Sequence, residues 1–250
     1  MITLITGATS GIGKSTAEIF ARNGYDLIIT GRRAERLQKL ADDLQEQHKV
    51  KIQTLCFDIR RLEEVKKNIA SLSSENKNID VLVNNAGLAS GSSTIQDGDT
   101  DDWEKMIDTN IKGLLYITKE VANLMIPYKK GHIINVGSVA GKEVYPNGNV
   151  YCASKYAVDA LNKAMRIDLL AHNIRVSAIH PGMVETEFSV VRFHGDEARA
   201  KKVYEGLQPL TPNDIADAIY WMASRPPHVN ITDVIITPTA QANATTVIRK

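Results

Sequence analysis

The beginning of the chain constrains its fold more strongly than any other stretch. A short run of β-forming residues, 2–6, leads directly into a glycine-rich turn, Gly7-Ala-Thr-Ser-Gly11-Ile-Gly13. From about Gly11 to Asn23 the apolar residues follow a helical pattern. A strand, a glycine-rich turn and a helix in this order are the context that a dinucleotide-binding site requires. The glycines let the backbone approach a phosphate group, and the helix N-terminus offers free N–H groups with a partial positive charge.

A competing motif overlaps this turn. Residues 8–15 read Ala-x-x-x-x-Gly-Lys-Ser, one glycine short of a P-loop in which Lys14 would reach a nucleoside triphosphate and Ser15 a magnesium ion. A P-loop enzyme also needs a strand that ends in an aspartate to hold the metal. The later strands end instead in Val83-Asn84-Asn85 and Val136-Gly137-Ser138. The sequence therefore favours the dinucleotide site, with Lys14 as a surface residue of the first helical turn.

Strand and helix patterns continue along the whole chain. Its 250 residues, 43% apolar and 24% charged, are enough for one large α/β domain with a substantial core. No internal repeat or second domain is evident, so we predict a single domain over residues 1–250. Further strands are predicted at about 26–30, 51–57, 79–83, 132–136, 174–179 and 233–237. Helices are predicted at about 34–48, 62–72, 101–128, 151–171 and 213–224.

Charge and composition exclude several classes of function. Thirty basic against twenty-nine acidic side chains leave a formal charge of +1, which gives no argument for nucleic acid or an anionic membrane as a partner. No apolar run approaches the ~20 residues that span a bilayer, and the N-terminus reads as a strand rather than a signal peptide. Two cysteines, Cys56 and Cys152, indicate no disulfide framework, so a reducing cytoplasm is the simplest location. The six histidines show no ligand spacing, and no catalytic metal is predicted.

A candidate proton-transfer site lies between Gly137 and Lys155. Tyr151 and Lys155 are spaced i, i+4, so on a helix they share one face. A free phenol has a pKa near ~10, and a fixed ammonium nearby would lower that pKa by favouring the phenolate. Ser138, at the end of an apolar run, could donate a hydrogen bond to the oxygen of a bound carbonyl or alcohol. Taken alone, a Tyr-x-x-x-Lys pair is more often a solvated helix face.

Accompanying motifs strengthen the chemical interpretation. Thr6-Gly-x-x-x-Gly-x-Gly opens the chain, Asn84-Asn85-Ala86-Gly87 follows the fourth apolar run, and Pro181-Gly182 follows the sixth. With Ser138 and Tyr151-x-x-x-Lys155, these motifs make the chain closely resemble the short-chain dehydrogenase/reductase family from Thr6 to about residue 238. The resemblance implies a Rossmann-type, doubly wound parallel sheet of about seven strands flanked by helices, and an oxidoreductase acting on CH–OH groups.

The resemblance also implies where a cofactor would bind. An NAD site places an acidic side chain after the second strand, but this chain has Gly31-Arg32-Arg33, which favours the 2′-phosphate of NADP. One of these arginines could instead merely begin the next helix, and Asp58 could cap the helix at 62–72 as well as contact adenine. The cofactor-binding residues expected by resemblance are Gly7, Thr9, Ser10, Gly11, Ile12, Gly13, Arg32, Arg33, Asp58, Ile59, Asn85, Tyr151, Lys155, Pro181, Gly182, Val184 and Thr186.

Catalytic roles follow from the same resemblance. Tyr151 would exchange a proton with the substrate, Lys155 would lower the pKa of Tyr151 and hold the nicotinamide ribose, and Ser138 would fix the reacting oxygen. The backbone of Asn110 would help to hold a water molecule that relays protons from Lys155. An asparagine in a helix is usually only a polar surface or kink residue, so this role depends wholly on the resemblance. The family also pairs its long helices between subunits, which implies a homotetramer.

The expected substrate is a small 3-hydroxy acid. Three segments are similar to those of the NADP-dependent 3-hydroxy acid dehydrogenases, which act on serine and allo-threonine: Asp102-Trp103-Glu104, Val191-Arg192-Phe193 and Leu210-Thr211-Pro212. Residues at about 183–212 would form a substrate lid. Ser138, Tyr151 and Arg192 are the expected substrate contacts, with Arg192 binding the carboxylate or remaining a surface arginine of the lid. Two alternatives stay open: another carbonyl substrate (a ketone, a 3-oxoacyl thioester or a sugar), and a non-catalytic NADP(H)-binding sensor.

Overall fold

Seven parallel strands form one sheet at the centre of the protein. The computed structural model describes all residues, 1–250, and orders the strands β3-β2-β1-β4-β5-β6-β7. Every neighbouring pair is parallel, which confirms the predicted Rossmann-type sheet. The strands are β1 (Ile2–Ile5), β2 (Asp26–Gly31), β3 (Ile52–Cys56), β4 (Val81–Asn84), β5 (Gly131–Val136), β6 (Ile174–Pro181) and β7 (Asp233–Ile236).

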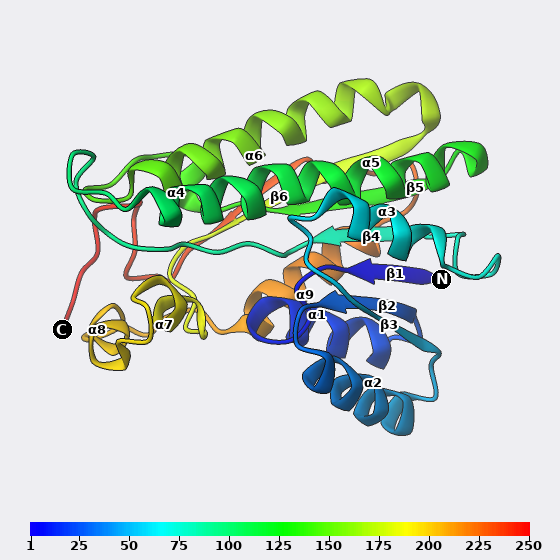
Figure 1. Ribbon diagram of the computed structural model, residues 1–250, viewed down its shortest axis with the longest axis horizontal. Helices are drawn as coiled ribbons and strands as arrows, with labels where there is room; N and C mark the ends of the chain where they lie inside the picture. The colour runs from blue at the N-terminus through cyan, green and yellow to red at the C-terminus, as the bar shows by residue number, and fades with distance from the viewer.

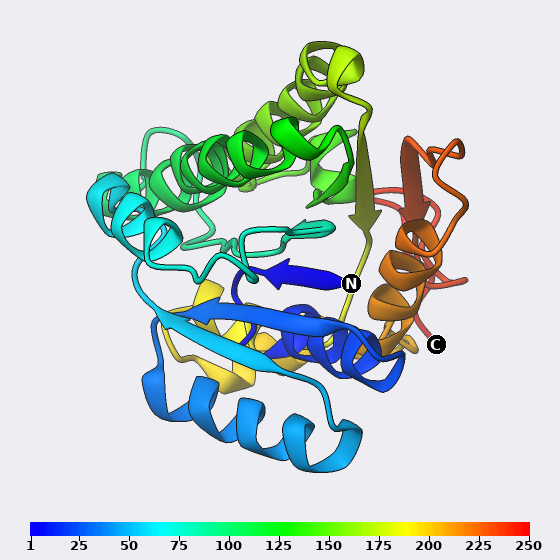
Figure 2. The same cartoon turned by 90° about the vertical axis from the view of Figure 1, so that its right-hand side faces the viewer.

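Helices cover both faces of the sheet (Figures 1 and 2). One face carries α1 (Gly11–Arg22), α2 (Ala34–His48) and α9 (Pro212–Ala223), and the other carries α3 (Leu62–Ala70), α5 (Leu114–Met125) and α6 (Asn149–Asp168). Three shorter helices are α4 (Thr100–Ile107), α7 (Phe188–Arg192) and α8 (Glu197–Lys202). None of the helices combines the length and the apolar character that a membrane crossing requires.

The strands build two separate cores because successive side chains point to opposite faces of a sheet. Leu4 and Ile28 are fully buried in the core under α3, α5 and α6. Their neighbours in sequence, Ile5 and Ile29, are fully buried in the core under α1, α2 and α9. Strands buried on both faces therefore have no polar alternation and appear in the sequence as continuous apolar runs.

The prediction of one continuous helix over residues 101–128 is wrong, because the helix is interrupted in its middle. Between α4 and α5 the chain forms a π-helical segment, η1 (Asp108–Gly113), and after α5 it ends in a short 3-10 turn, η2 (Ile126–Tyr128). Gly113 allows close packing at this point, since a Cβ atom there would lie 2.9 Å from the Ile59 side chain. A hydrophobic period does not reveal one widened turn, although such π segments are frequent at functional sites.

The order of the strands decides where a ligand can bind. The chain builds outward from β1 to β2 and β3, then returns to add β4 on the other side of β1. Loops leaving the carboxyl ends of β1 and β4 therefore diverge and open a crevice between them, the usual ligand site of such sheets.

Candidate active site

A cleft of about 520 Å³ runs along the carboxyl ends of the strands. Of the residues expected from the sequence to bind cofactor or substrate or to act in catalysis, two lie outside its lining, Gly13 and Asn110. All the others line it: Gly7, Thr9, Ser10, Gly11, Ile12, Arg32, Arg33, Asp58, Ile59, Asn85, Ser138, Tyr151, Lys155, Pro181, Gly182, Val184, Thr186 and Arg192.

The glycine-rich turn at the start of α1 leaves its backbone accessible to the cleft. Gly7 and Gly11 have φ values of +68° and +52°, which L side chains rarely adopt. Ser10 is the N-cap of α1 but makes no side-chain capping bond, so the first-turn N–H groups remain available to an anion. Gly13 allows close packing behind the turn, because a Cβ atom there would overlap the Asn85 side chain and the carbonyl of Gly7.

Arg33 connects the glycine-rich turn to the predicted lid. Its guanidinium donates to Thr9 Oγ1 at 2.7 Å and Ser10 Oγ at 2.8 Å, and it forms an ion pair with Glu187 at 3.0 Å. Arg33 is also the N-cap residue of α2, so it stands at the beginning of this helix as one reading of the sequence expected. Arg36 binds the same carboxylate, Glu187, at 2.9 Å. Two guanidinium groups and two hydroxyl groups thus gather close to the end of β2.

Asp58 lies at the end of β3 but does not cap α3. Its carboxylate pairs with Arg60 at 2.6 Å, and the N-cap of α3 is Arg61. The alternative that Asp58 caps α3 is therefore wrong. Its carboxylate is engaged by Arg60, in the turn that precedes the helix. Burial acts to raise the pKa of Asp58, but hydrogen bonds and charge from Arg60 outweigh it and hold that pKa below its usual range.

The proposed acid–base group sits in the inner part of the cleft. Tyr151 and Lys155 are both buried on α6, and Ser138 is buried in the turn after β5. The Lys155 ammonium donates to the Val136 carbonyl at 3.0 Å and lies 6.0 Å from the centre of the Tyr151 ring. Ser138 Oγ accepts a hydrogen bond from the N–H of Ala140 at 3.1 Å, which fixes its side chain.

One expectation about these groups is corrected by the structure. The sequence predicted that Lys155 lowers the pKa of Tyr151. Burial instead raises the pKa of Tyr151, with Tyr145 adding to the effect and Ser138 opposing it, while burial lowers the pKa of Lys155 to about 8. The reason is that both groups lose hydration in the same pocket, which disfavours the charged form of each.

Asn110 lies in η1, immediately behind the cleft. Its amide nitrogen donates to the Leu88 carbonyl at 2.8 Å and to Ser154 Oγ at 3.0 Å, and its amide oxygen accepts from the Leu88 N–H at 2.9 Å. The side chain is 2% exposed. It therefore ties the loop after β4 to the helix that carries Tyr151, and only its backbone remains for other partners.

The predicted lid, residues 183–212, contains α7 and α8, and most residues from Met183 to Arg192 together with Val203 and Tyr204 contribute to the lining of the cleft. Arg192 at the end of α7 donates to the Tyr145 hydroxyl at 3.1 Å, and its guanidinium lies 5.3 Å from the centre of that ring. The backbone of Arg192 accepts from the Gly91 N–H at 2.9 Å. His194 pairs with the buried Asp102 at 3.0 Å, so two contacts hold this segment against the loop after β4.

Tyr145, Glu187 and Gln241 are among the cleft residues that sequence reasoning missed. Gln241 accepts a hydrogen bond from the Met183 N–H at 2.9 Å, so the polar tail reaches the end of β6. Farther along, the tail packs on the predicted lid, where the Lys250 N–H donates to the Gly206 carbonyl at 2.8 Å. No local pattern could have indicated these residues, because each contact joins segments far apart in the chain.

The residues of the cleft fit a nicotinamide dinucleotide with a 2′-phosphate. Accessible N–H groups suit the diphosphate, and Arg32 and Arg33 replace the carboxylate that an unphosphorylated ribose would need. Fold and cleft together define the class of an NADP-dependent oxidoreductase, and a serine, a tyrosine and a lysine line this cleft.

Comparisons with known proteins agree with this class. The family model for short chain dehydrogenases matches residues 1–196. The NADP-dependent 3-hydroxy acid dehydrogenase YdfG of Salmonella typhi is 47% identical over 245 residues, which cover 98% of this chain and 97% of that protein. Sulfoacetaldehyde reductase 2 of Chromohalobacter salexigens is 44% identical over 242 residues, 96% and 95% of the two chains. The closed form of serine dehydrogenase complexed with NADP+ has a TM-score of 0.93 and 44% identity, with both chains fully covered.

The chain therefore belongs to the short-chain dehydrogenase/reductase family. The P-loop interpretation of residues 8–15 is wrong, since the same residues form the dinucleotide turn of this family.

Proposed function

We propose that the protein transfers hydride between NADP and the 3-hydroxyl or 3-oxo carbon of small 3-hydroxy acids, such as serine, allo-threonine or the pair 3-hydroxypropionate and malonic semialdehyde. The observation that carries this proposal is the position of Arg192, which lines the same cleft as Ser138, Tyr151 and Lys155. A guanidinium and an acid–base pair in one cleft suit a substrate with a carboxylate at one end and a reacting oxygen at the other.

The cleft residues named from the sequence are the proposed cofactor contacts. The turn from Gly7 to Gly13 binds the diphosphate through its N–H groups, and Arg32 and Arg33 bind the 2′-phosphate. Asp58 and Ile59 lie at the adenine end of the cleft. The nicotinamide half of the cofactor contacts Asn85, Pro181, Gly182, Val184 and Thr186. NADP, when bound, supplies the hydride chemistry.

The protein's own side chains handle the proton. Tyr151 donates its hydroxyl proton to the substrate oxygen during reduction and accepts it during oxidation. Ser138 donates a hydrogen bond to the same oxygen, which stabilises the negative charge that develops there. Lys155 holds the nicotinamide ribose, and the backbone of Asn110 supports the path by which protons reach solvent.

Arg192 and Tyr145 form the proposed carboxylate site. The Tyr145 ring and hydroxyl hold the guanidinium in place, so less side-chain freedom is lost when an anion binds. A sulfonate has the same charge and similar acceptor oxygens, so a sulfonated aldehyde is the alternative substrate that this site favours, in keeping with the sulfoacetaldehyde reductase among the relatives. A neutral ketone or sugar would offer Arg192 no anionic partner.

A substrate panel tests the proposal directly. NADPH absorbance is followed with malonic semialdehyde, sulfoacetaldehyde and a neutral ketone, and NADP+ reduction with serine, allo-threonine and 3-hydroxypropionate. Turnover of the carboxylates supports the proposal, and turnover of sulfoacetaldehyde alone or of the ketone alone would replace the substrate class. Tight NADPH binding with no turnover of any compound would favour a sensor.

We also propose a homotetramer in the cytoplasm. Exposed apolar side chains occur on two separate surfaces: Leu115 and Ile167 on α5 and α6, and Trp221 and Ile235 on α9 and β7. Two distinct apolar surfaces fit the two interfaces of a tetramer with two-fold axes, and sedimentation analysis measures the assembly. Cys56 and Cys152 are both free, in keeping with a reducing compartment.

A further inference from the structure

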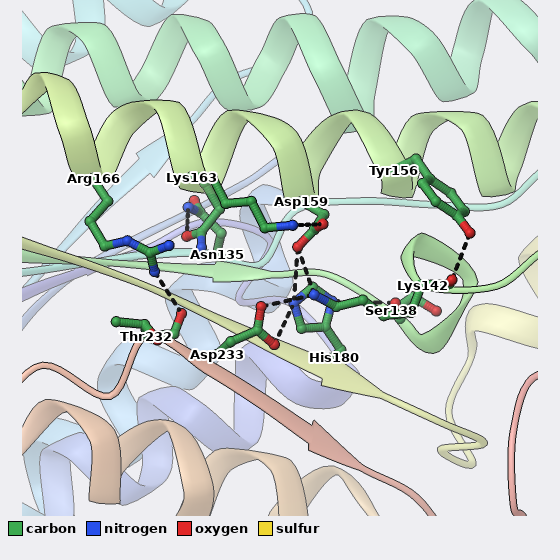
Figure 3. A network of polar contacts seen from close by, with 11 residues as sticks. Asn135, Ser138, Lys142, Tyr156, Asp159, Lys163, Arg166, His180, Thr232 and Asp233 are labelled. Atoms are coloured by element: carbon green, nitrogen blue, oxygen red, sulfur yellow. Dashed lines mark hydrogen bonds and ion pairs between the residues drawn. The ribbon is translucent and has the colours of Figure 1, made fainter.

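A buried polar network lies directly behind Ser138, outside the lining of the cleft (Figure 3). His180 on β6 is 0% exposed, and its Nδ1 lies 3.3 Å from the carbonyl oxygen of Ser138. The imidazole also lies against the preceding residue, since a Cβ atom at Gly137 would overlap the ring. We propose that His180 is a positioning residue that holds the backbone of Ser138 for catalysis. This inference rests on the catalytic role proposed above for Ser138.

The contact with Ser138 determines which ring nitrogen of His180 carries the proton. A carbonyl oxygen only accepts hydrogen bonds, so Nδ1 must carry the proton. The other nitrogen, Nε2, has no hydrogen-bond partner and lies 3.4 Å from Asp233 and 3.8 Å from Asp159. Burial lowers the pKa of His180, which favours the neutral ring. The ring therefore contacts the backbone of Ser138 through Nδ1.

Asp159, His180 and Asp233 have the side-chain types of a metal site, although the histidine spacing in the sequence gave no sign of it. A side-chain cation already lies between the two carboxylates. The Lys142 ammonium contacts Asp159 at 2.7 Å and Asp233 at 2.8 Å, and Lys163 binds the remaining oxygen of Asp159 at 2.7 Å. The two lysines balance the charge of the two aspartates without a metal ion. We therefore assign the cluster a structural role in supporting the site.

The network ties the serine turn, residues 138–142, to the helix that carries the tyrosine. Asp159 lies on α6 four residues after Lys155 and holds Lys142, the last residue of the turn. The Tyr156 hydroxyl donates to the Lys142 carbonyl at 2.6 Å. In the middle of the turn, Gly141 packs so closely on α6 that a Cβ atom would lie 2.5 Å from the carbonyl oxygen of Lys155.

The serine turn is therefore held at both ends, by His180 at its start and by α6 at its end. This arrangement sets the position of Ser138 Oγ relative to Tyr151, which lies on the same helix. A displacement of about 1 Å in such a group can lower turnover by about 100-fold.

Two similar substitutions separate the two nitrogens of His180. His180→Asn places an amide N–H where Nδ1 stands and keeps the bond to Ser138, whereas His180→Gln places its amide at the Nε2 position and loses it. We expect His180→Asn to retain most of the wild-type kcat, and His180→Gln to lose about 10- to 100-fold. Affinity for NADPH, measured by fluorescence titration, should stay at the wild-type value in both.

A double-mutant cycle tests whether His180 acts through Ser138. In a Ser138→Ala background, His180→Gln should cause no further loss of kcat beyond about twofold. His132→Gln is the matched control, because His132 is also a buried histidine of the sheet and hydrogen-bonds Ser177 at 2.7 Å, far from the serine turn. It should change thermal stability without changing kcat.

Several outcomes would overturn the inference. Equal kcat in the wild type, His180→Asn and His180→Gln would remove the positioning role, and so would a loss in His180→Gln that is just as large in the Ser138→Ala background. A kcat that EDTA abolishes and a divalent cation restores would make the cluster a metal site. If Ser138→Ala itself leaves kcat unchanged, the proposed function of Ser138 fails, which the cycle distinguishes from failure of the inference about His180.

Discussion

The ammonium nitrogen of Lys155 lies 6.0 Å from the centre of the Tyr151 ring and donates to the Val136 carbonyl at 3.0 Å. The two side chains share one buried pocket, and burial changes their pKa values in opposite directions. The phenol keeps its proton at neutral pH, so the free protein is prepared to donate a proton, as reduction of a carbonyl requires. Oxidation needs additional stabilisation of the phenolate once cofactor and substrate are bound.

Tyr151→Phe should abolish turnover without loss of cofactor binding. The substitution removes the hydroxyl proton, and general acid catalysis contributes about 10²- to 10⁴-fold. The ring keeps its edge contact with Phe188, whose centre lies 5.7 Å away. Steady-state kinetics and NADPH titration measure the two effects separately. An undiminished kcat would remove Tyr151 from the mechanism.

Arg192→Ala should raise KM for carboxylate substrates by about 10- to 100-fold, the value of a hydrogen bond to a charged group. KM for a neutral carbonyl compound should change little, and Arg192→Lys should restore only part of the loss because a lysine cannot bind in bidentate fashion. Arg199→Ala is the control, since Arg199 stacks on Phe193 in the same segment but lies outside the cleft. An unchanged KM in Arg192→Ala would make Arg192 a surface residue of the lid.

Glu187→Gln should strengthen NADPH binding. Glu187 occupies Arg33 at 3.0 Å and Arg36 at 2.9 Å, and these arginines hold its pKa below the usual value, so it competes as an anion with a 2′-phosphate. All three side chains are about half exposed to solvent, which limits the gain in affinity to about two- to fivefold. NADH affinity should not change. Glu185→Gln, an exposed neighbour outside the cleft, serves as the comparison, and weaker NADPH binding in Glu187→Gln would show that Glu187 orients the arginines.

The free energy of unfolding should fall in mild acid because of His132. Burial lowers its pKa to about 3, against 6.5 for an exposed histidine. Between these values the unfolded chain binds a proton that the folded protein does not, so stability falls as pH decreases from 6.5 towards 3. The loss between pH 6.5 and 4.5 should be about 2 to 3 kcal/mol. Urea unfolding at several pH values measures it, and His132→Gln should flatten this dependence; an equal slope in that variant would assign the effect to other groups.

The sequence predicted the fold almost completely because the relevant information is local. Continuous apolar runs marked the strands, glycines marked the turn before α1, and the spacing of Tyr151 and Lys155 placed both on one helix face. Those features depend only on backbone geometry and hydrophobic period. The helix predicted at 101–128 shows the limit, since a single widened turn around Asn110 leaves no mark in the hydrophobic pattern.

The tertiary structure alone decided the electrostatics and the long-range partners of the site. The direction of the Tyr151 pKa depends on how much water the folded pocket excludes, which no spacing encodes. The ion pair of Glu187 with Arg33, the contact of Arg192 with Tyr145 and the placement of His180 behind Ser138 each join segments that are distant in the chain. Local sequence thus determined which reactive side chains share a turn or a helix face, whereas folding determined which charges and hydrogen bonds surround them.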